Sequence, residues 1–343
     1  MFPTIIAFPE VNPESPLSLI ASLTPFKHTT TVYNELLPIF DTQASFQDHF
    51  TPTLKVPVKL PAPTTNLDAS GRCEEPETLS VPLIDWFTKY FPSQSPLYYL
   101  KDFHYTPHLP IITPPLFASM DVLNPFLRAA NMGDYDFLYH GPANSTTPIH
   151  TDVLFSHSYS YNVTGIKEWT FYDTIPSDST TASDSTTGTR QITTTQHPGE
   201  VMFVPSGLAH SVVNQTAAIS LNRNWITPSV LPRTLATLLT EVAAVDEEIE
   251  KWGMVLDAAE REEMLRGCCG LNVGMFFAMT LMAIQQRYPT ITDPATAQDF
   301  ATLVDVLGAV KDEAARICSL LTNGRAALAQ ADVYIDITEK LRS

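Results

Sequence analysis

The chain has 343 residues, of which 44% are hydrophobic and 17% are charged, a composition typical of a globular protein with a large core. Its 37 acidic residues outnumber 20 basic ones, and the formal net charge of −17 argues against electrostatic binding of nucleic acid or of an anionic membrane surface. A basic protein or peptide is the partner that this charge favours.

The four cysteines show neither the spacing of a zinc ribbon nor that of a disulfide framework. The first residues, MFPTIIAFPEVNPESP, lack the basic start and long apolar core of a secretory signal. The most apolar later run, MFFAMTLMAI, is much shorter than the roughly 20 residues that a membrane span needs, and it predicts a buried helix. We therefore expect a protein of a reducing compartment, the cytoplasm or also the nucleus, with no membrane partner.

The N-terminal region, residues 1–95, mixes short helical patterns with proline-rich connections such as FTPTLKVPVKLPAPTT. Within it, the segment VPLIDWFTKYF is typical of a short amphipathic helix. Proline interrupts both helices and strands. We therefore expect this region to wrap irregularly around a separate core and to pack on it.

Short runs rich in β-branched and aromatic residues follow over residues 96–228, separated by turns with Pro, Gly and Asn. They are YDFLYHG, SYSYNVTG, IKEWTFYD, GEVMFVPSG, HSVVN and AAISLNRNW. Such a series is typical of a β-sandwich or barrel. A Ser/Thr-rich stretch without apolar periodicity, residues 174–196, predicts a mobile, solvent-exposed insertion between two strands.

Helical periodicity begins after Pro228, where apolar residues from Leu235 to Trp252 recur every three or four positions. Gly253 is expected to end this helix, and the Asn323–Gly324 pair breaks the last long helical stretch. We therefore expect residues 229–343 to form an all-α region appended to the β domain.

Two histidines and an aspartate in the β-rich region are candidates for one metal site. His150 and Asp152 are two residues apart, and alternate side chains of a strand point to the same face. His210 follows a Pro-Ser-Gly turn farther along the chain. Two histidines and a carboxylate form the facial triad of non-haem Fe(II) oxygenases, and the same donors also suit zinc. Because His-x-Asp recurs often by chance, an ordinary hydrogen-bonded pair is the competing interpretation.

A lone lysine in the run IKEWTFYD suggests a bound acid. Lys167 alternates with Trp169 and Phe171, so it faces the core if these aromatic side chains do. A buried ammonium needs an anionic partner, which an acid bound inside the barrel would supply. The alternative is an edge lysine whose ammonium reaches solvent.

Further polar side chains could hold the same acid. Thr147 lies three residues before His150, and Asn222 and Asn224 share one face of a later strand. Each of these side chains can hydrogen-bond a carboxylate. Ordinary turn and edge-strand hydrogen bonding explains each of them equally well.

Together these residues resemble the JmjC (jumonji C) family of Fe(II)- and 2-oxoglutarate-dependent oxygenases. The resemblance covers residues 97–228 through LYYLKDF, DFLYHGPANSTTPIHTD, GIKEW, HPGEVMFVPSGLAHSVVN and SLNRNW. It implies a mainly β fold, a double-stranded β-helix of the cupin or jelly-roll type at residues 96–228. The N-terminal region would be mixed α/β wrapping, and iron would lie at one mouth of the barrel.

The resemblance also implies a role for each matching residue. His150, Asp152 and His210 would bind iron as the catalytic centre, and Lys167 would pair with the distal carboxylate of 2-oxoglutarate. The other cosubstrate contacts would come from Thr147, Tyr139, Ser160, Asn224 and, as a weaker candidate, Asn222. Several relatives have asparagine at the position of Ser160, so the serine is a departure from the family pattern.

The reaction that the resemblance implies consumes O2, converts 2-oxoglutarate to succinate and CO2, and hydroxylates a side chain of a protein or peptide. The phrases YHGPANSTTPIHTDV and SYSYNVTGIKEW are similar to a branch of the family that hydroxylates lysine in a translation release factor. Demethylation of N-methyl-lysine and a non-catalytic cupin-fold scaffold are the alternatives. A zinc hydrolase fits less well, because Lys167 is positioned for a dicarboxylate. The sequence leaves the oligomeric state open.

Overall fold

The structure is a computed structural model, and it describes residues 26–29, 49–60, 77–93, 95–109, 120–172, 191–287, 294–317, 319, 321 and 324–342. The chain divides into two compact units that interleave along the sequence. The first unit comprises residues 1–117, 135–152 and 157–224, and the second comprises residues 118–134, 153–156 and 225–343. The domain boundaries expected after residues 95 and 228 stay predictions.

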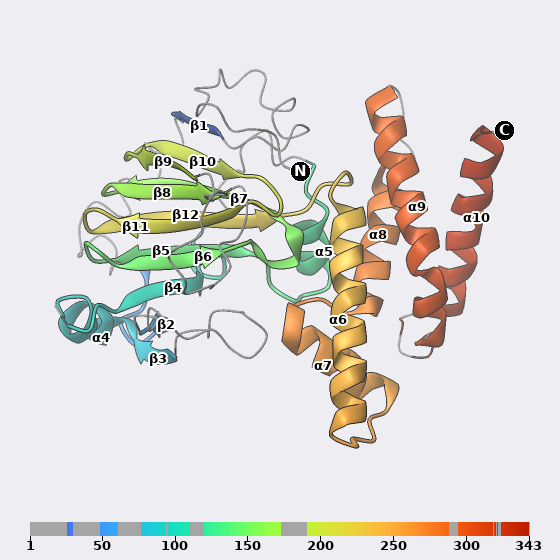
Figure 1. The fold of residues 1–343 in the computed structure, drawn as a ribbon, viewed down its shortest axis with the longest axis horizontal. Helices are drawn as coiled ribbons and strands as arrows, with labels where there is room; N and C mark the ends of the chain where they lie inside the picture. The colour runs from blue at the N-terminus through green and yellow to red at the C-terminus, as the bar shows by residue number, and fades with distance from the viewer. Residues whose placement is uncertain are drawn as a thin grey trace, which may run out of the picture. The chain divides into compact units, whose positions relative to one another are not determined.

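The first unit is built on two antiparallel sheets (Figure 1). The larger has the strand order β1-β10-β7-β12-β5-β4-β2-β3, and the smaller has the order β6-β11-β8-β9. The strands are β1 Phe26–Thr29, β2 Lys55–Lys59, β3 Thr78–Pro82, β4 Tyr99–His104, β5 Asp136–Gly141, β6 Thr146–His150, β7 His157–Thr164, β8 Lys167–Tyr172, β9 Gln191–Gln196, β10 Glu200–Val204, β11 Ala209–Asn214 and β12 Ala218–Trp225. The chain alternates between the sheets from β5 to β8 and again from β9 to β12. This is the predicted double-stranded β-helix of cupin type.

The interior of the first unit is apolar around β8. Successive β8 residues alternate between buried and half-buried, so Lys167 shares the inward face with Trp169 and Phe171, as predicted. An apolar cluster is formed by Trp169, Phe171, Met202, Val204, Leu208 and Val212 from β8, β10, β11 and the turn before β11. The inward face of β8 therefore places one lysine beside an otherwise apolar core.

The proline-rich segment near residue 55 is a regular strand, which corrects the expectation of irregular wrapping. β2 pairs with β3 along its length, and Pro57 lies opposite Ser80. On its other side, β2 is in register with β4 only at Val58 and Lys59, so Pro57 is not required to donate a hydrogen bond there. The predicted amphipathic helix is present as two short turns, α4 Leu83–Asp85 and the π-helix η1 Trp86–Tyr90.

The predicted insertion at residues 174–196 ends earlier than expected. Its last six residues, Gln191–Gln196, form β9 and pair antiparallel with β8 from Lys167 to Tyr172. The run contains Ile192 and three threonines, whose β-branched side chains suit a half-buried strand. Residues 174–190 of the expected insertion lie outside the described residues.

A buried ion pair joins β5 to β12. Asp136 and Arg223 are direct cross-strand partners, and the guanidinium donates to the two carboxylate oxygens at 2.5 and 2.8 Å. The two side chains are 1% and 3% exposed. We expect Asp136→Asn to lower the free energy of unfolding by about 3–5 kcal/mol, because a buried guanidinium would lose its counter-charge. Urea unfolding monitored by circular dichroism measures this loss.

The matched control for this pair is Glu263→Gln. Glu263 forms an ion pair with Arg266 on the surface of a helix, with both side chains exposed. Exposed pairs of this kind contribute little to stability, so no measurable change is expected. Equal losses in the two variants would contradict the assignment of the buried pair.

The second unit consists of helices (Figure 1). They are α5 Leu123–Ala129, the 3-10 turn η3 Val153–Phe155, α6 Leu231–Lys251, α7 Ala258–Cys269, α8 Val273–Arg287, α9 Pro294–Arg316 and α10 Gly324–Arg342. α6 ends at Lys251, one residue before the predicted last helical residue Trp252, and Gly253 follows, as predicted. A break separates α9 from α10, as predicted. The run predicted as a buried helix lies in α8, where Phe276, Phe277, Met279 and Ile284 are buried.

The packing of this unit centres on α9, which contacts α6, α8 and α10. No single helix in the described part of the chain is long and apolar enough to cross a membrane; α7 and α8, which meet at a bend of 76°, pass that test only when taken together, by length and composition alone.

Candidate metal centre

The pairing of β6 with β11 brings two histidines together. His150 ends β6, and His210 in β11 is its direct cross-strand partner. Their ring centroids lie 4.3 Å apart. The register then shifts between His210 and Val212, and irregularities of this kind re-aim side chains at functional sites. Two segments distant in sequence thus supply adjacent imidazoles.

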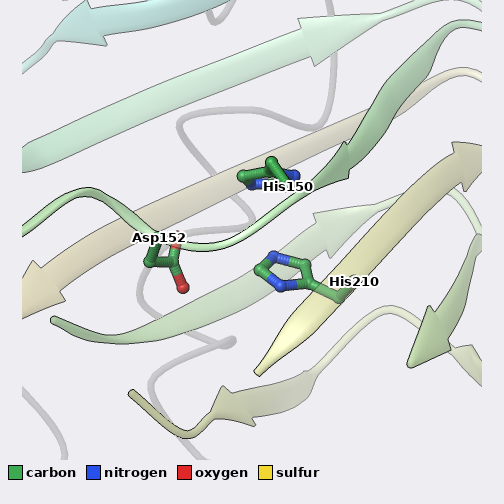
Figure 2. A group of neighbouring side chains, drawn as sticks. All are labelled: His150, Asp152 and His210. Atoms are coloured by element: carbon green, nitrogen blue, oxygen red, sulfur yellow. The ribbon is translucent and has the colours of Figure 1, made fainter. Parts of the chain in front are cut away.

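Asp152 joins the two histidines from beyond the strand. The ligand atoms of His150, Asp152 and His210 all lie within 4.8 Å of one another, and Figure 2 shows the three side chains gathered together. β6 ends at His150, and Asp152 precedes the turn Val153–Phe155. The predicted residues do converge, but the prediction that strand alternation brings them together was wrong. β6 ends before Asp152, and the chain beyond β6 carries Asp152 to the histidines.

Hydrogen bonds fix which nitrogen each histidine offers. The Nδ1 atoms of His150 and His210 lie 2.9 and 3.0 Å from the carbonyl oxygens of Pro148 and Leu208. A carbonyl oxygen can only accept, so each Nδ1 carries a proton, and in the neutral form of each ring Nε2 keeps the lone pair. Burial, and then the nearby His210, lower the pKa of His150 from 6.5 to about 3. His150 is therefore neutral at pH 7, the form that binds a metal.

Ser158 in β7 orients the carboxylate of the group. Its hydroxyl donates to Asp152 Oδ2 at 2.7 Å. Such outer hydrogen bonds fix the direction of a ligand's lone pairs, and their loss typically weakens metal binding by about 10–100-fold. We expect Ser158→Ala to weaken binding of Fe(II) or Mn(II) by that factor, measured by anaerobic calorimetry.

A hydroxyl on the outward face of β8 provides the control. Thr170 is half-buried, and its hydroxyl lies 3.3 Å from that of Thr193 in β9. Thr170→Val should leave metal affinity unchanged. Unaltered affinity in Ser158→Ala would show that Asp152 keeps its direction without this hydrogen bond.

Lys167 is buried deeply and has a hydroxyl as its hydrogen-bond partner. Its side chain is among the largest fully buried ones, and Nζ donates to Ser220 Oγ at 2.5 Å. Within the described ranges, no carboxylate forms an ion pair with it. Burial, and then the charge of Lys101, lower the pKa of Lys167 from 10.5 to about 7. A bound anion would relieve both effects.

Tyr139 lies beside Lys167, but its hydroxyl is already engaged. The Lys167 Nζ atom is 6.0 Å from the centroid of the Tyr139 ring. The hydroxyl donates to Asp102 Oδ1 at 2.8 Å, so its single proton is directed to that carboxylate. The expected hydrogen bond from Tyr139 to the cosubstrate stays a prediction.

The remaining predicted residues lie on β6, β7 and β12 and are buried or half-buried. Ser160 alternates with Ser158 on β7 and therefore shares its face. Ser160 is 1% exposed, and its Oγ atom has no hydrogen-bond partner among the described residues. Asn222 Nδ2 donates to Ser220 Oγ at 3.1 Å. The other two predicted residues, Thr147 and Asn224, are buried.

Several residues of this region were missed by sequence reasoning. Ser158 and Ser220 precede predicted residues by two positions in β7 and β12, so strand alternation could have identified them. Lys101 and Asp102 form a charged pair inside the otherwise apolar run LYYLKDF, which was the available signal. The salt bridge of Lys59 to Asp102 at 2.6 Å had no sequence signal, because it depends on the pairing of β2 with β4.

Comparison with known proteins gives related sequences. The family described as "JmjC domain, hydroxylase" matches residues 176–225. The human protein named 2-oxoglutarate and iron-dependent oxygenase JMJD4 is 32% identical over 230 residues, which are 60% of this chain and 55% of that protein. The mouse protein of the same name is 31% identical over 217 residues, 55% of this chain and 51% of that protein.

A plant protein is similar to a comparable extent. The Arabidopsis thaliana protein named arginine-specific demethylase JMJ20 is 32% identical over 218 residues, 52% of this chain and 47% of that protein. The chain thus spans about half the length of the curated relatives it matches.

Proposed function

We propose that the chain, which is similar to JmjC-domain oxygenases, is an Fe(II)- and 2-oxoglutarate-dependent oxygenase that hydroxylates a protein side chain, with lysine as the target residue. The observation that carries the proposal is the convergence of His150, Asp152 and His210 on one point. The buried ammonium of Lys167 adds the second requirement, a cation that suits a dicarboxylate cosubstrate.

The donor set fits ferrous iron. Two imidazoles with free Nε2 lone pairs and one carboxylate leave the remaining positions of an octahedral ion open, as the facial-triad oxygenases require. His150, Asp152 and His210 would hold the ion, and Ser158 would keep the carboxylate in position. Zinc shares these donors but makes no use of a lysine buried on the same interior.

The protein's own residues bind and position the reactants. When bound, Fe(II) supplies the oxidation in which O2 and 2-oxoglutarate give succinate and CO2 and one oxygen atom enters a substrate C–H bond. Lys167 pairs with the distal carboxylate, and Ser220 holds the ammonium in place. Ser160 offers a buried, unsatisfied hydroxyl to the same cosubstrate. The apolar cluster around β8 limits the entry of water.

The substrate proposal is a lysine of a basic protein segment, a translation release factor in the first instance. The formal net charge of −17 favours the approach of such a segment. The JMJD4 relatives carry oxygenase in their names, which supports the reaction class but not the target residue.

One assay tests the reaction and separates its variants. Purified protein is mixed anaerobically with Fe(II), 2-oxoglutarate and a lysine peptide from the release factor, and O2 is then admitted. Succinate formation with a gain of one oxygen atom in the peptide supports hydroxylation. If the protein does not bind 2-oxoglutarate in the same anaerobic mixture, the oxygenase proposal is overturned and a non-catalytic scaffold is favoured.

A demethylase is the second candidate, and the similarity to a protein named arginine-specific demethylase favours keeping it. Hydroxylation of an N-methyl group is followed by release of formaldehyde. Demethylation therefore differs from side-chain hydroxylation only in which carbon is attacked. Methylated lysine and methylated arginine peptides in the same assay test this candidate. Succinate formation with a mass loss of about 14 units in the peptide, the replacement of one methyl group by hydrogen, would overturn the hydroxylase assignment.

A further inference from the structure

Two lysines approach the same tyrosine ring inside the first unit. The Nζ atoms of Lys101 and Lys167 lie 5.5 and 6.0 Å from the centroid of the Tyr139 ring. Ammonium groups within about 6 Å of an aromatic centroid are attracted to its face. The two cations come from different strands, β4 and β8, which lie in different sheets. Tyr139 therefore marks a point where positive charge from both sheets gathers.

An irregularity of β4 positions Lys101 and its neighbour. The register between β4 and β5 shifts between Leu100 and Phe103, so Lys101 and Asp102 lie within a bulge. Asp102 has a φ of 62°, a left-handed conformation that is strained for a residue other than glycine. Bulges with strained residues re-aim side chains and are common beside active sites. Regular strand pairing is interrupted here, and the interruption orients the charged side chains of Lys101 and Asp102.

Asp102 contacts both Tyr139 and a third lysine. Its carboxylate accepts a hydrogen bond from the Tyr139 hydroxyl at 2.8 Å and forms an ion pair with Lys59 at 2.6 Å. We call Lys59, Lys101, Asp102, Tyr139 and Lys167 the Tyr139 cluster. Its three ammonium groups and one carboxylate give a formal sum of +2 when all are ionised. This excess of positive charge would attract an anionic group, such as a single carboxylate, bound beside the cluster.

We propose that Lys101 is a second cation for the distal carboxylate of the cosubstrate, acting with Lys167 to select dicarboxylic over monocarboxylic 2-oxo acids. The inference rests on the proposed function, since it assigns a specificity residue to that site. Asp102 and Lys59 are positioning residues, because they act through Tyr139 and the bulge. The charge of Lys101 also contributes to the lowered pKa of Lys167, which places the two ammonium groups within electrostatic reach.

A purely structural role is the competing explanation. In that case Lys101 stabilises the fold by packing on Tyr139, and its removal affects all ligands alike. The two roles differ in one measurable quantity, the preference for a second carboxylate. 2-Oxopentanoate has the five-carbon chain of 2-oxoglutarate without the distal carboxylate, so it serves as the probe.

The experiment is anaerobic calorimetry of the full chain with Fe(II) and either acid. We expect Lys101→Met to weaken 2-oxoglutarate binding about tenfold, the effect of one half-buried charge–charge hydrogen bond, and 2-oxopentanoate binding less than about twofold. Lys101→Arg should retain most of the preference. Lys89 also lies over a tyrosine ring, that of Tyr90 at 4.8 Å, but it is exposed, so Lys89→Met is the matched control and should change neither constant.

The outcomes separate the two proposals. Failure of the wild-type chain to bind 2-oxoglutarate would overturn both the proposed function and this inference. Binding by the wild type that Lys101→Met leaves unchanged would overturn the inference alone. Equal weakening of both acids would assign Lys101 a structural role and also overturn it, and thermal unfolding of each variant identifies any loss of folding.

Discussion

Asp152→Ala is expected to weaken Fe(II) binding by about a hundredfold or more and to abolish succinate formation at micromolar iron. Structural zinc sites bind their ion through four ligands with about 10–16 kcal/mol, roughly 3 kcal/mol per ligand, and we expect a loss of that order here. Asp152 is also the one anionic member of the group of three, and its loss leaves two neutral imidazoles facing a dication.

Metal affinity and turnover are measured separately for this variant. Anaerobic calorimetry gives the affinity for Fe(II), and succinate release gives turnover at increasing iron concentrations. Asp312→Ala, an exposed aspartate of α9, removes the same net charge and should alter neither quantity. If Asp152→Ala bound iron as tightly as the wild-type chain, the proposed metal centre would be excluded.

The strands that carry the site were predictable because each has a local pattern. In IKEWTFYD the alternation of side chains grouped Lys167 with Trp169 and Phe171 but left an edge lysine as the alternative, which the burial of Lys167 excludes. β9 was missed because its threonines read equally well as a polar loop, and only pairing with β8 decides between the two. β2 was missed because Pro57 counts against a strand unless the register of its neighbours is known.

The members of the candidate site were chosen from their residue types, whereas their geometry could not be predicted from the sequence. The types of His150, Asp152 and His210 indicate a metal site, but their convergence depends on the register of β6 and β11, whose partners are about 60 residues apart. The hydrogen bond from Lys167 to Ser220 depends in the same way on long-range packing. Interactions of this kind arise from topology, and single-sequence patterns carry no record of them.

Lys167→Met is expected to have opposite effects on binding and on stability. Methionine has a similar length but no charge, so the distal carboxylate of 2-oxoglutarate loses its buried partner. Removing one member of a buried ion pair costs about 3–5 kcal/mol, which corresponds to a loss of affinity of roughly 10²–10⁴-fold. The chain without cosubstrate should become more stable, because a fully buried ammonium with no ion-pair partner in the described structure is replaced by an apolar group.

The stability gain has a defined dependence on pH. Burial and then Lys101 lower the pKa of Lys167 in the folded chain to about 7, whereas the unfolded chain keeps a value near 10.5. Between these values the unfolded state binds more protons, so wild-type stability rises with pH, by at most about 1.4 kcal/mol per pH unit. Below pH 7 the full cost of the buried charge is present. The advantage of Lys167→Met should therefore be largest below pH 7 and shrink as the pH rises toward 10.5.

Urea unfolding of the wild-type chain and of Lys167→Met measures the effects on binding and on stability. It is carried out at pH 7 and pH 9.5, with and without 2-oxoglutarate and Fe(II). Lys89→Met is the control for an exposed lysine. The cosubstrate should stabilise only the wild-type chain, because only there does it neutralise a buried ammonium. At pH 7 it should therefore reverse the order of stability of the two chains. A variant that is less stable than the wild type and still binds 2-oxoglutarate would mean that Lys167 supports the fold without contacting the cosubstrate. A lysine that only stabilises the fold would give the same order of stability for the two chains with and without 2-oxoglutarate. A reversed order therefore indicates that the buried ammonium of Lys167 contacts the ligand.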